Sequence, residues 1–226
     1  MTIIELQGLI GARPDGVWGE KSKAALLAAF ANRSAPLITA ADIAATARRL
    51  GCSPRQLDAV RAVESAGRGF DSDGRPKRLF ERHKFHRFTG GRFSPSAFSQ
   101  SAAGGYSLDA DGNGINDNWD KLSAAIATGE VDAAFMATSW GAFQIMGEWW
   151  DALGYASPFA MALACVASEA AHLDMLARYI EHFRLKPALA ALTSNPATCR
   201  AFAAAYNGPG YRANRYDEKL AERMAG

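Results

Sequence analysis

The 226-residue sequence is poor in cysteine, with only Cys52, Cys165 and Cys199. Their number is odd, their spacing is wide, and no Cys-x-x-Cys pair occurs. Neither a disulfide framework nor a cysteine metal site is therefore predicted. We expect these residues to act as small buried apolar side chains in a protein made in a reducing cytosol.

Long apolar runs and strong charge are also missing. No segment approaches the roughly 18 apolar residues that a membrane-spanning helix needs, so stable membrane insertion is not expected. Residues 1–7 have neither the basic start nor the apolar core of a signal peptide. A net charge of +2 is too small to indicate a nucleic-acid partner. The apolar content of 49% supports a sizeable buried core.

Glu64 is the first candidate for chemistry. Residues 57–65 read as an apolar helix whose last turn carries this carboxylate, and the Gly-containing stretch 66–69 follows. Burial beside such an opening raises a carboxyl pKa, which makes the group a general acid suited to glycoside hydrolysis. A solvated Glu at a helix end is the alternative interpretation.

Two later segments favour the catalytic interpretation. They are Ser139-Trp140-Gly141-Ala142-Phe143-Gln144-Ile145-Met146 and Ala205-Tyr206-Asn207-Gly208-Pro209-Gly210. With Val63-Glu64-Ser65 before them, they resemble in type and order the catalytic framework of goose-type lysozymes and soluble lytic transglycosylases. With the segment 79–91 added, the chain more closely resembles phage and prophage modular endolysins of the N-acetylmuramidase family, over roughly residues 50–222.

The resemblance implies a mostly α chain, with an α+β lysozyme-like catalytic domain over residues 39–226 that contains a small β-element. It implies hydrolysis of the β-1,4 bond between N-acetylmuramic acid and N-acetylglucosamine in peptidoglycan, with Glu64 as the acid. Sugar and acid would be positioned by Ser65, Gln144, Tyr206 and Asn207. Two alternatives stay open, namely a lytic transglycosylase that leaves 1,6-anhydro ends and a non-catalytic wall-binding protein.

The same resemblance supplies a setting. We expect a monomer made in the host bacterial cytoplasm without a signal peptide, which reaches periplasmic peptidoglycan when the cell lyses. Trp140 is a candidate for stacking on sugar faces, as is either Trp149 or Trp150, with buried packing as the alternative for each.

Glu81 is the second catalytic candidate. It falls in the expected β-region, where lysozyme-like enzymes often place the carboxylate that activates water. Carboxyl groups about 6.5–9.5 Å apart indicate inversion, whereas about 5–5.5 Å indicates a covalent intermediate. The alternative is an ion pair between Glu81 and either Arg78 or Arg82. His83 and His86 lack further ligands at zinc-site spacing, so packing is expected for them.

Residues 1–35 predict a small N-terminal helical module that ends at a linker near residues 32–36. Leu-Gln, Asp-Gly-x-x-Gly and a following Ala-rich helix resemble a shortened peptidoglycan-binding repeat. The residues that carry this resemblance are Leu6, Gln7, Asp15, Gly16, Trp18 and Gly19. The alternative is a helical hairpin that merely packs onto the catalytic domain.

Apolar spacing and capping signals predict the remaining elements. Helices are expected over residues 21–30, 39–50, 53–64, 119–128, 132–138, 142–153, 158–183, 195–207 and 214–224. Between residues 69 and 98 the helical period lapses, which predicts the small β-region.

A loop rich in Asp and Asn has the spacing of an EF-hand-type calcium site. Side-chain oxygens fall at positions 1, 3, 5 and 9, a main-chain carbonyl at 7, Gly at 6 and a carboxylate at 12. The residues that would supply ligands are Asp109, Asp111, Asn113, Ile115, Asp117 and Asp120. The sequence therefore predicts a structural Ca²⁺, although the chemistry itself requires no cofactor. An ordinary polar turn is the alternative.

Overall fold

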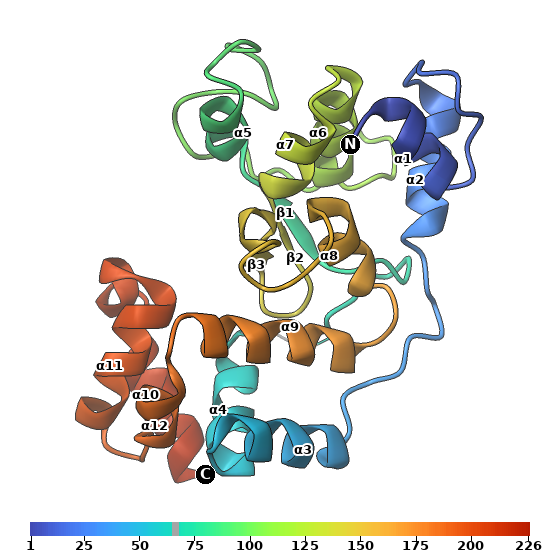
Figure 1. Ribbon diagram of the computed structural model, residues 1–226. Coiled ribbons are helices and arrows are strands. Elements are labelled where there is room, and N and C mark those ends of the chain that lie inside the picture. Colours follow the sequence, from blue (N-terminus) through green and yellow to red (C-terminus); the bar gives the residue numbers. More distant parts are fainter. Residues whose placement is uncertain (65–67) are drawn as a thin grey trace. The chain divides into compact units, whose positions relative to one another are not determined.

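The computed structural model describes residues 1–64 and 68–226 (Figure 1). These residues form two compact units. Unit 1 consists of Met1–Ala35 and Phe70–Ala167, and unit 2 of Pro36–Gly69 and Ser168–Gly226. The chain therefore passes from unit 1 to unit 2, returns to unit 1, and ends in unit 2.

Helices make up most of both units. Unit 1 contains α1 (Ile3–Leu9), α2 (Glu20–Ala29), α5 (Arg82–Phe88), α6 (Asp117–Ala127), α7 (Val131–Met136), α8 (Pro158–Ala164), the short 3-10 helix η1 (Gly147–Trp149) and the strands β1 (Arg78–Phe80), β2 (Thr138–Trp140) and β3 (Ile145–Met146). Unit 2 contains α3 (Ala40–Leu50), α4 (Pro54–Glu64), α9 (Glu169–His182), α10 (Lys186–Ala190), α11 (Pro196–Asn207), α12 (Tyr216–Ala225) and the 3-10 helix η2 (Pro209–Arg212). The predicted class, mostly helical with a small β-element, is confirmed. No helix in the described part of the chain is long and apolar enough to cross a bilayer.

The β-element is a three-stranded antiparallel sheet in the order β1-β2-β3. Strand β1 pairs with β2 so that Leu79 lies opposite Ser139, and β2 pairs with β3 so that Trp140 lies opposite Ile145. Side chains alternate between the faces of a sheet. Because Trp140 turns into the core, its neighbour Ser139 points to the other face, toward the loop that ends β2.

An aromatic cluster forms the core of unit 1. The ring of Trp140 lies 5.5 Å from Phe30, 5.9 Å from Phe135 and 6.0 Å from Trp119, measured between centroids. Phe159 of α8 packs edge-on against Phe135 at 5.3 Å. Such contacts add to the free energy gained by burying large rings. Helices α2, α6, α7 and α8 and strand β2 are therefore held around one centre.

Residues 1–35 belong to this unit by several independent contacts. Phe30 at the end of α2 lies in the aromatic cluster, and Lys23 forms an ion pair with Asp120 of α6 at 2.6 Å. The Trp18 indole donates a hydrogen bond to Ser123 at 2.9 Å. This is the arrangement of the helical-hairpin alternative. Wall binding by the segment stays a prediction.

Capping signals placed the first two helices of unit 2 correctly. Thr39 and Asp42 form a reciprocal capping box at the start of α3. Ser53 and Gln56 do the same for α4, with the Ser53 hydroxyl accepting from the Gln56 N–H at 3.2 Å. Both helices then turn apolar residues into the core, including Leu50 and Leu57. Helix α4 therefore delivers Glu64 at its C-terminal end, as the sequence predicts.

Two predicted elements are wrong in and around the sheet. The expected β-region contains the helix α5, which buries Phe85 against Phe80, Phe93 and Phe98. The predicted helix over residues 142–153 is instead strand β3 followed by η1. A Cβ on Gly147 would lie 2.1 Å from the carbonyl oxygen of Phe135, so the backbone packs closely at this point. The helical periodicity of the sequence did not reveal this contact.

The predicted helix over residues 158–183 is also wrong, because it is two helices. Helix α8 ends at Ala164, and Ser168 then caps α9 by accepting from the Ala171 N–H at 3.1 Å. A Ser side chain that accepts a hydrogen bond from a following main-chain N–H favours the start of a new helix over continuation of the previous one. Apolar residues on both sides of the break continued the helical pattern and concealed it.

Replacing Phe30 with Ala should destabilise the protein by roughly 3–5 kcal/mol, because it leaves a cavity in a fully packed aromatic cluster. Urea unfolding followed by tryptophan fluorescence measures this free energy. Leu9→Ala is the control, since Leu9 is an exposed apolar residue of the same segment. Equal losses for the two variants would contradict a core role for Phe30.

Candidate active site

Glu64 lies in unit 2 at the C-terminal end of α4, with its side chain largely buried. Burial raises the pKa of this carboxyl above its ordinary value, while the hydroxyl of Tyr216 acts in the opposite direction. The Tyr216 hydroxyl has no hydrogen-bond partner among the described residues, so its interaction with Glu64 is not a direct hydrogen bond. Desolvation is therefore the dominant influence on Glu64, as the sequence analysis expects.

Tyrosines surround this carboxyl. The Tyr206 ring stacks on Phe202 at 5.5 Å and on Tyr216 at 6.3 Å, and Tyr179 of α9 meets it edge-on at 5.5 Å. Burial and the charge of Glu64 raise the pKa values of Tyr206 and Tyr216. These phenols therefore stay protonated and serve as hydroxyl groups that face a carboxyl in an apolar setting.

Tyr206 and Asn207 end α11, where the sequence analysis placed them, and Asn207 is exposed. Tyr216 was missed. It is the first residue of α12, and its ring is buried. The signal in the sequence is an aromatic residue at the start of the last helix, soon after the Tyr-Asn motif. Nothing in the local pattern ties that residue to α4. Ser65 lies outside the described residues.

Glu81 lies in unit 1 immediately after β1, and its main-chain N–H donates to the Ala137 carbonyl at 2.8 Å. Its side chain is 16% exposed. The Tyr106 hydroxyl donates to Oε2 of Glu81 at 2.8 Å, and His83 Nδ1 lies 3.2 Å from the same oxygen. The expected ion-pair partners are engaged elsewhere: Arg78 contacts Asp71, and Arg82 donates to main-chain carbonyls.

Gln144 lies in the loop between β2 and β3. Its backbone has a φ of 49°, a strained conformation for a residue other than glycine, and its side chain is exposed. The Ser139 hydroxyl donates to Oε1 of Gln144 at 3.0 Å, while Nε2 donates to the Gly141 carbonyl at 2.8 Å. The amide is therefore held in place from both ends. Strain of this kind is concentrated at functional sites.

Trp140 is fully buried in the aromatic cluster. The suggestion that its ring stacks on sugar is therefore wrong for this residue, and the packing alternative is correct. Glu81 and Gln144 lie in unit 1, and Glu64, Tyr206 and Asn207 lie in unit 2. A carboxyl with a raised pKa, such as Glu64, is suited to donate a proton, and an ionised carboxylate can orient water.

The residues that carry the wall-binding resemblance make the N-terminal module compact. Leu6 is fully buried, and the buried Gln7 amide donates to Asp15, Ser22 and the Val17 carbonyl at 3.0–3.1 Å. Its oxygen accepts from the Gly16 N–H at 2.9 Å. Gly19 is the N-cap of α2. A hollow of about 510 Å³ lies beside them, lined by Arg13, Val17 and Lys21 among others.

The Asp/Asn loop brings three carboxylates together. Oxygens of Asp109, Asp111 and Asp117 lie within 4.8 Å of one another. Within the loop, Oδ1 of Asn113 accepts a hydrogen bond from the Ile115 N–H at 2.6 Å. Asp120, the expected twelfth ligand, pairs through Oδ1 with Lys23, while its Oδ2 is buried without a hydrogen-bond partner. Asp109, Asp111 and Asp117 therefore form one group of carboxylates that could hold a metal ion, and Asp120 lies outside this group.

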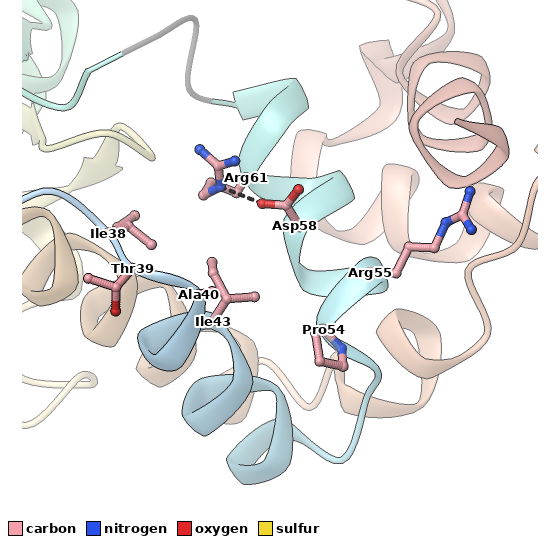
Figure 2. Close-up of a pocket in the computed structure, with 8 residues that line it drawn as sticks. All are labelled: Ile38, Thr39, Ala40, Ile43, Pro54, Arg55, Asp58 and Arg61. Atoms are coloured by element: carbon pink, nitrogen blue, oxygen red, sulfur yellow. Dashed lines mark hydrogen bonds and ion pairs between the residues drawn. The ribbon is translucent and has the colours of Figure 1, made fainter.

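A separate hollow of about 470 Å³ lies in unit 2 between the start of α3 and the side of α4 (Figure 2). Arg61 and Asp58 of α4 form an ion pair at 2.6 Å, drawn as a dashed line in Figure 2, across the hollow from Ile38 and Thr39. Arg61 is one turn before Glu64. No local sequence pattern predicts this hollow, because its two walls come from different helices.

Residues 53–225 match the family described as N-acetylmuramidase. The chain is also similar to a solved structure, that of the Burkholderia AP3 phage endolysin, with 32% sequence identity and a TM-score of 0.74. The match covers 99% of this chain and 93% of that one. No curated protein matches the chain. The matched region contains Glu64, Glu81, Gln144, Tyr206 and Asn207.

Glu64→Gln should raise the melting temperature near neutral pH, with a gain that shrinks on acidification. Because the folded pKa of Glu64 is raised, its stability contribution is fully present below the ordinary value of 4.5 and is lost as pH rises through the folded pKa. Gln does not titrate and avoids this loss. Thermal melts from pH 4 to 8 measure the difference, with the exposed Glu222→Gln as control. A difference that is constant with pH would contradict the burial of Glu64.

Proposed function

Since the chain belongs to the N-acetylmuramidase family, we propose that it acts as an endolysin on the β-1,4 bond between N-acetylmuramic acid and N-acetylglucosamine. The chain is a lysozyme-type glycoside hydrolase, and its substrate is bacterial peptidoglycan. The proposal concerns the bond that is cut, the product that is formed and the residues that carry the reaction.

One observation carries the proposal for the acid. Glu64 ends an amphipathic helix in surroundings that raise its pKa. A glycosidic oxygen is a poor leaving group until it is protonated, and a carboxyl that keeps its proton near neutral pH can supply that proton. Tyr206 and Tyr216 stack on each other, and both phenols interact electrostatically with Glu64. Glu64 is therefore the acid in the proposed mechanism.

Glu81 takes the second role. Its Oε2 accepts a hydrogen bond from the Tyr106 hydroxyl, and His83 Nδ1 lies 3.2 Å from the same oxygen, so the carboxylate is oriented. It orients the attacking water or stabilises the oxocarbenium-like transition state. Gln144 and Asn207 present exposed amides that can bind sugar hydroxyls, and Tyr206 fixes the position of the acid. Ser65 belongs to the same proposed set on sequence grounds.

The setting is part of the proposal. The chain resembles a phage endolysin over nearly its whole length. We therefore place its synthesis in the host bacterial cytoplasm and its action on periplasmic peptidoglycan after release at lysis, as a monomer. Residues 1–35 are proposed to add wall affinity through their exposed surface, since Val17 and Leu9 are exposed apolar residues there.

A structural Ca²⁺ in the Asp/Asn loop completes the proposal. Asp109, Asp111 and Asp117 lie close enough to share one cation, and hard oxygen ligands favour Ca²⁺ over soft metals. Asp120 is drawn toward Lys23. The ion would stabilise the loop between α5 and α6 and take no part in bond cleavage.

Mass spectrometry of digested peptidoglycan tests the function. Wild-type protein should release reducing muramic ends. Glu64→Gln should abolish release because the acid is lost, while Glu81→Gln should reduce turnover by about 100-fold or more. Both variants should keep their folded circular dichroism spectra. The exposed Glu222→Gln serves as the matched carboxylate control and should keep full activity.

Each contrary result has a defined meaning. Products with 1,6-anhydro ends would make the chain a lytic transglycosylase. Full activity of Glu64→Gln would show that Glu64 is not the catalytic acid. Binding of wild-type protein to cell walls without any released product would instead make it a wall-binding protein on a lysozyme scaffold.

Calcium should raise the melting temperature of chelator-treated protein, because a bound ion stabilises the folded state by mass action and relieves repulsion among the carboxylates. With Asp at the last position, the expected dissociation constant is roughly 10⁻⁵ to 10⁻³ M. Melts with and without millimolar Ca²⁺ measure the effect. The Asp109→Ala/Asp111→Ala variant should show no rise, and a rise equal to that of wild type would leave the loop an ordinary polar turn.

A further inference from the structure

A tyrosine reaches Glu81 from a distant loop. The Tyr106 hydroxyl donates to Glu81 Oε2 at 2.8 Å, across 25 positions of sequence. The Tyr106 side chain is 48% exposed and its neighbour Leu108 is 71% exposed, so the ring is not a core residue. This exposed ring is held beside Glu81 by the hydrogen bond from its hydroxyl to the carboxylate and by the loop that contains Tyr106.

Arg82 fastens this loop. Its guanidinium donates to the carbonyls of Ala102 at 3.0 Å and Ala103 at 3.1 Å. The next two residues are Gly104 and Gly105, both with positive φ. A Cβ on either would lie 3.0–3.2 Å from the same guanidinium, so the backbone passes close to Arg82 at two positions whose positive φ favours glycine.

The residues next to Tyr106 in the chain form hydrogen bonds with α6. The Ser107 hydroxyl donates to the Asp117 carboxylate, and the Asp117 N–H donates to the Leu108 carbonyl at 2.9 Å. The Lys121 ammonium donates to the Gly105 carbonyl. The loop around Tyr106 is therefore held in place by Arg82 and by Asp117 and Lys121 of α6.

We propose that Tyr106 is the positioning residue of Glu81. The inference rests on the proposed function, because it assumes that Glu81 acts on water or on the transition state. Both contacts of Glu81, from Tyr106 and from His83, fall on Oε2. Oε1 is then the oxygen that is turned to the reaction, and the bond from Tyr106 sets its direction.

The donor is suited to this role. Partial burial and the charge of Glu81 raise the pKa of Tyr106, so the phenol keeps its proton throughout the pH range of wall hydrolysis. A hydroxyl that donates to a carboxylate makes a charge-assisted hydrogen bond, which is stronger and more directional than a neutral one. Its loss frees the carboxylate to rotate without removing its charge.

Tyr106→Phe tests the inference, because it deletes the hydroxyl and keeps the ring. Initial rates of reducing-end release at varied peptidoglycan concentration should show kcat reduced by about 10- to 100-fold, the scale of one hydrogen bond to a charged group. The half-saturating concentration should stay within about twofold. Leu108→Ala, which removes an exposed side chain of the same loop, should leave both values unchanged.

The decisive measurement is a double-mutant cycle with Glu81→Gln. If Tyr106 acts through Glu81, adding Tyr106→Phe to Glu81→Gln lowers kcat by less than about twofold. The full 10- to 100-fold loss in that background would mean that Tyr106 acts independently of Glu81, and the inference would be overturned. So would a rise in half-saturating concentration with unchanged kcat, which would make Tyr106 a direct substrate contact.

These outcomes are separate from the test of the function itself. Product analysis of the wild-type protein decides whether the chain is a hydrolase. Wild-type release of reducing ends together with full activity of Tyr106→Phe would remove the inference and leave the proposed function standing. Melting temperatures of all variants confirm that changes in rate are not losses of fold.

Discussion

The burial of Trp140 is the constraint on which unit 1 depends. Its ring closes an aromatic cluster to which α2, α6, α7 and α8 all contribute or pack. Because side chains alternate along a strand, fixing Trp140 inward fixes Ser139 on the other face of β2. Ser139 then holds Gln144, and the pairing of β2 with β1 sets where Glu81 leaves the sheet. A slip of one residue would turn Ser139 into the aromatic cluster and Trp140 out of it.

The two carboxylates are prepared by different physical means. Glu64 is largely buried and interacts with two tyrosines, and its burial favours the protonated form. Glu81 receives a hydroxyl and lies beside an imidazole, so its environment fixes an orientation. Glycoside hydrolysis asks for two carboxyl groups with unlike tasks. Helix α4 and the end of β1 provide two unlike surroundings for chemically similar side chains.

The N-terminal segment shows how a motif can keep its structure in a different context. Gln7 holds the Asp15–Val17 turn with three hydrogen bonds and binds Ser22 with a fourth, so the Leu-Gln and Asp-Gly residues make the small module compact. Phe30, at the end of the segment that resembles a shortened repeat, is a member of the aromatic cluster of unit 1. The residues of the motif therefore account for the local turn, while Phe30, Lys23 and Trp18 account for how the segment is attached.

Local signals in the sequence determined much of this protein. Thr39 with Asp42 and Ser53 with Gln56 cap α3 and α4, and the order of the Glu-Ser, Gly-x-x-Gln and Tyr-Asn motifs indicated the family. Capping and periodicity act within a few residues, so they can be read directly. Tertiary structure alone decided that residues 142–153 are not a helix, that Tyr216 faces Glu64, and that Tyr106 reaches Glu81. Each of these depends on contacts between segments far apart in the chain, whose free energy no local pattern contains.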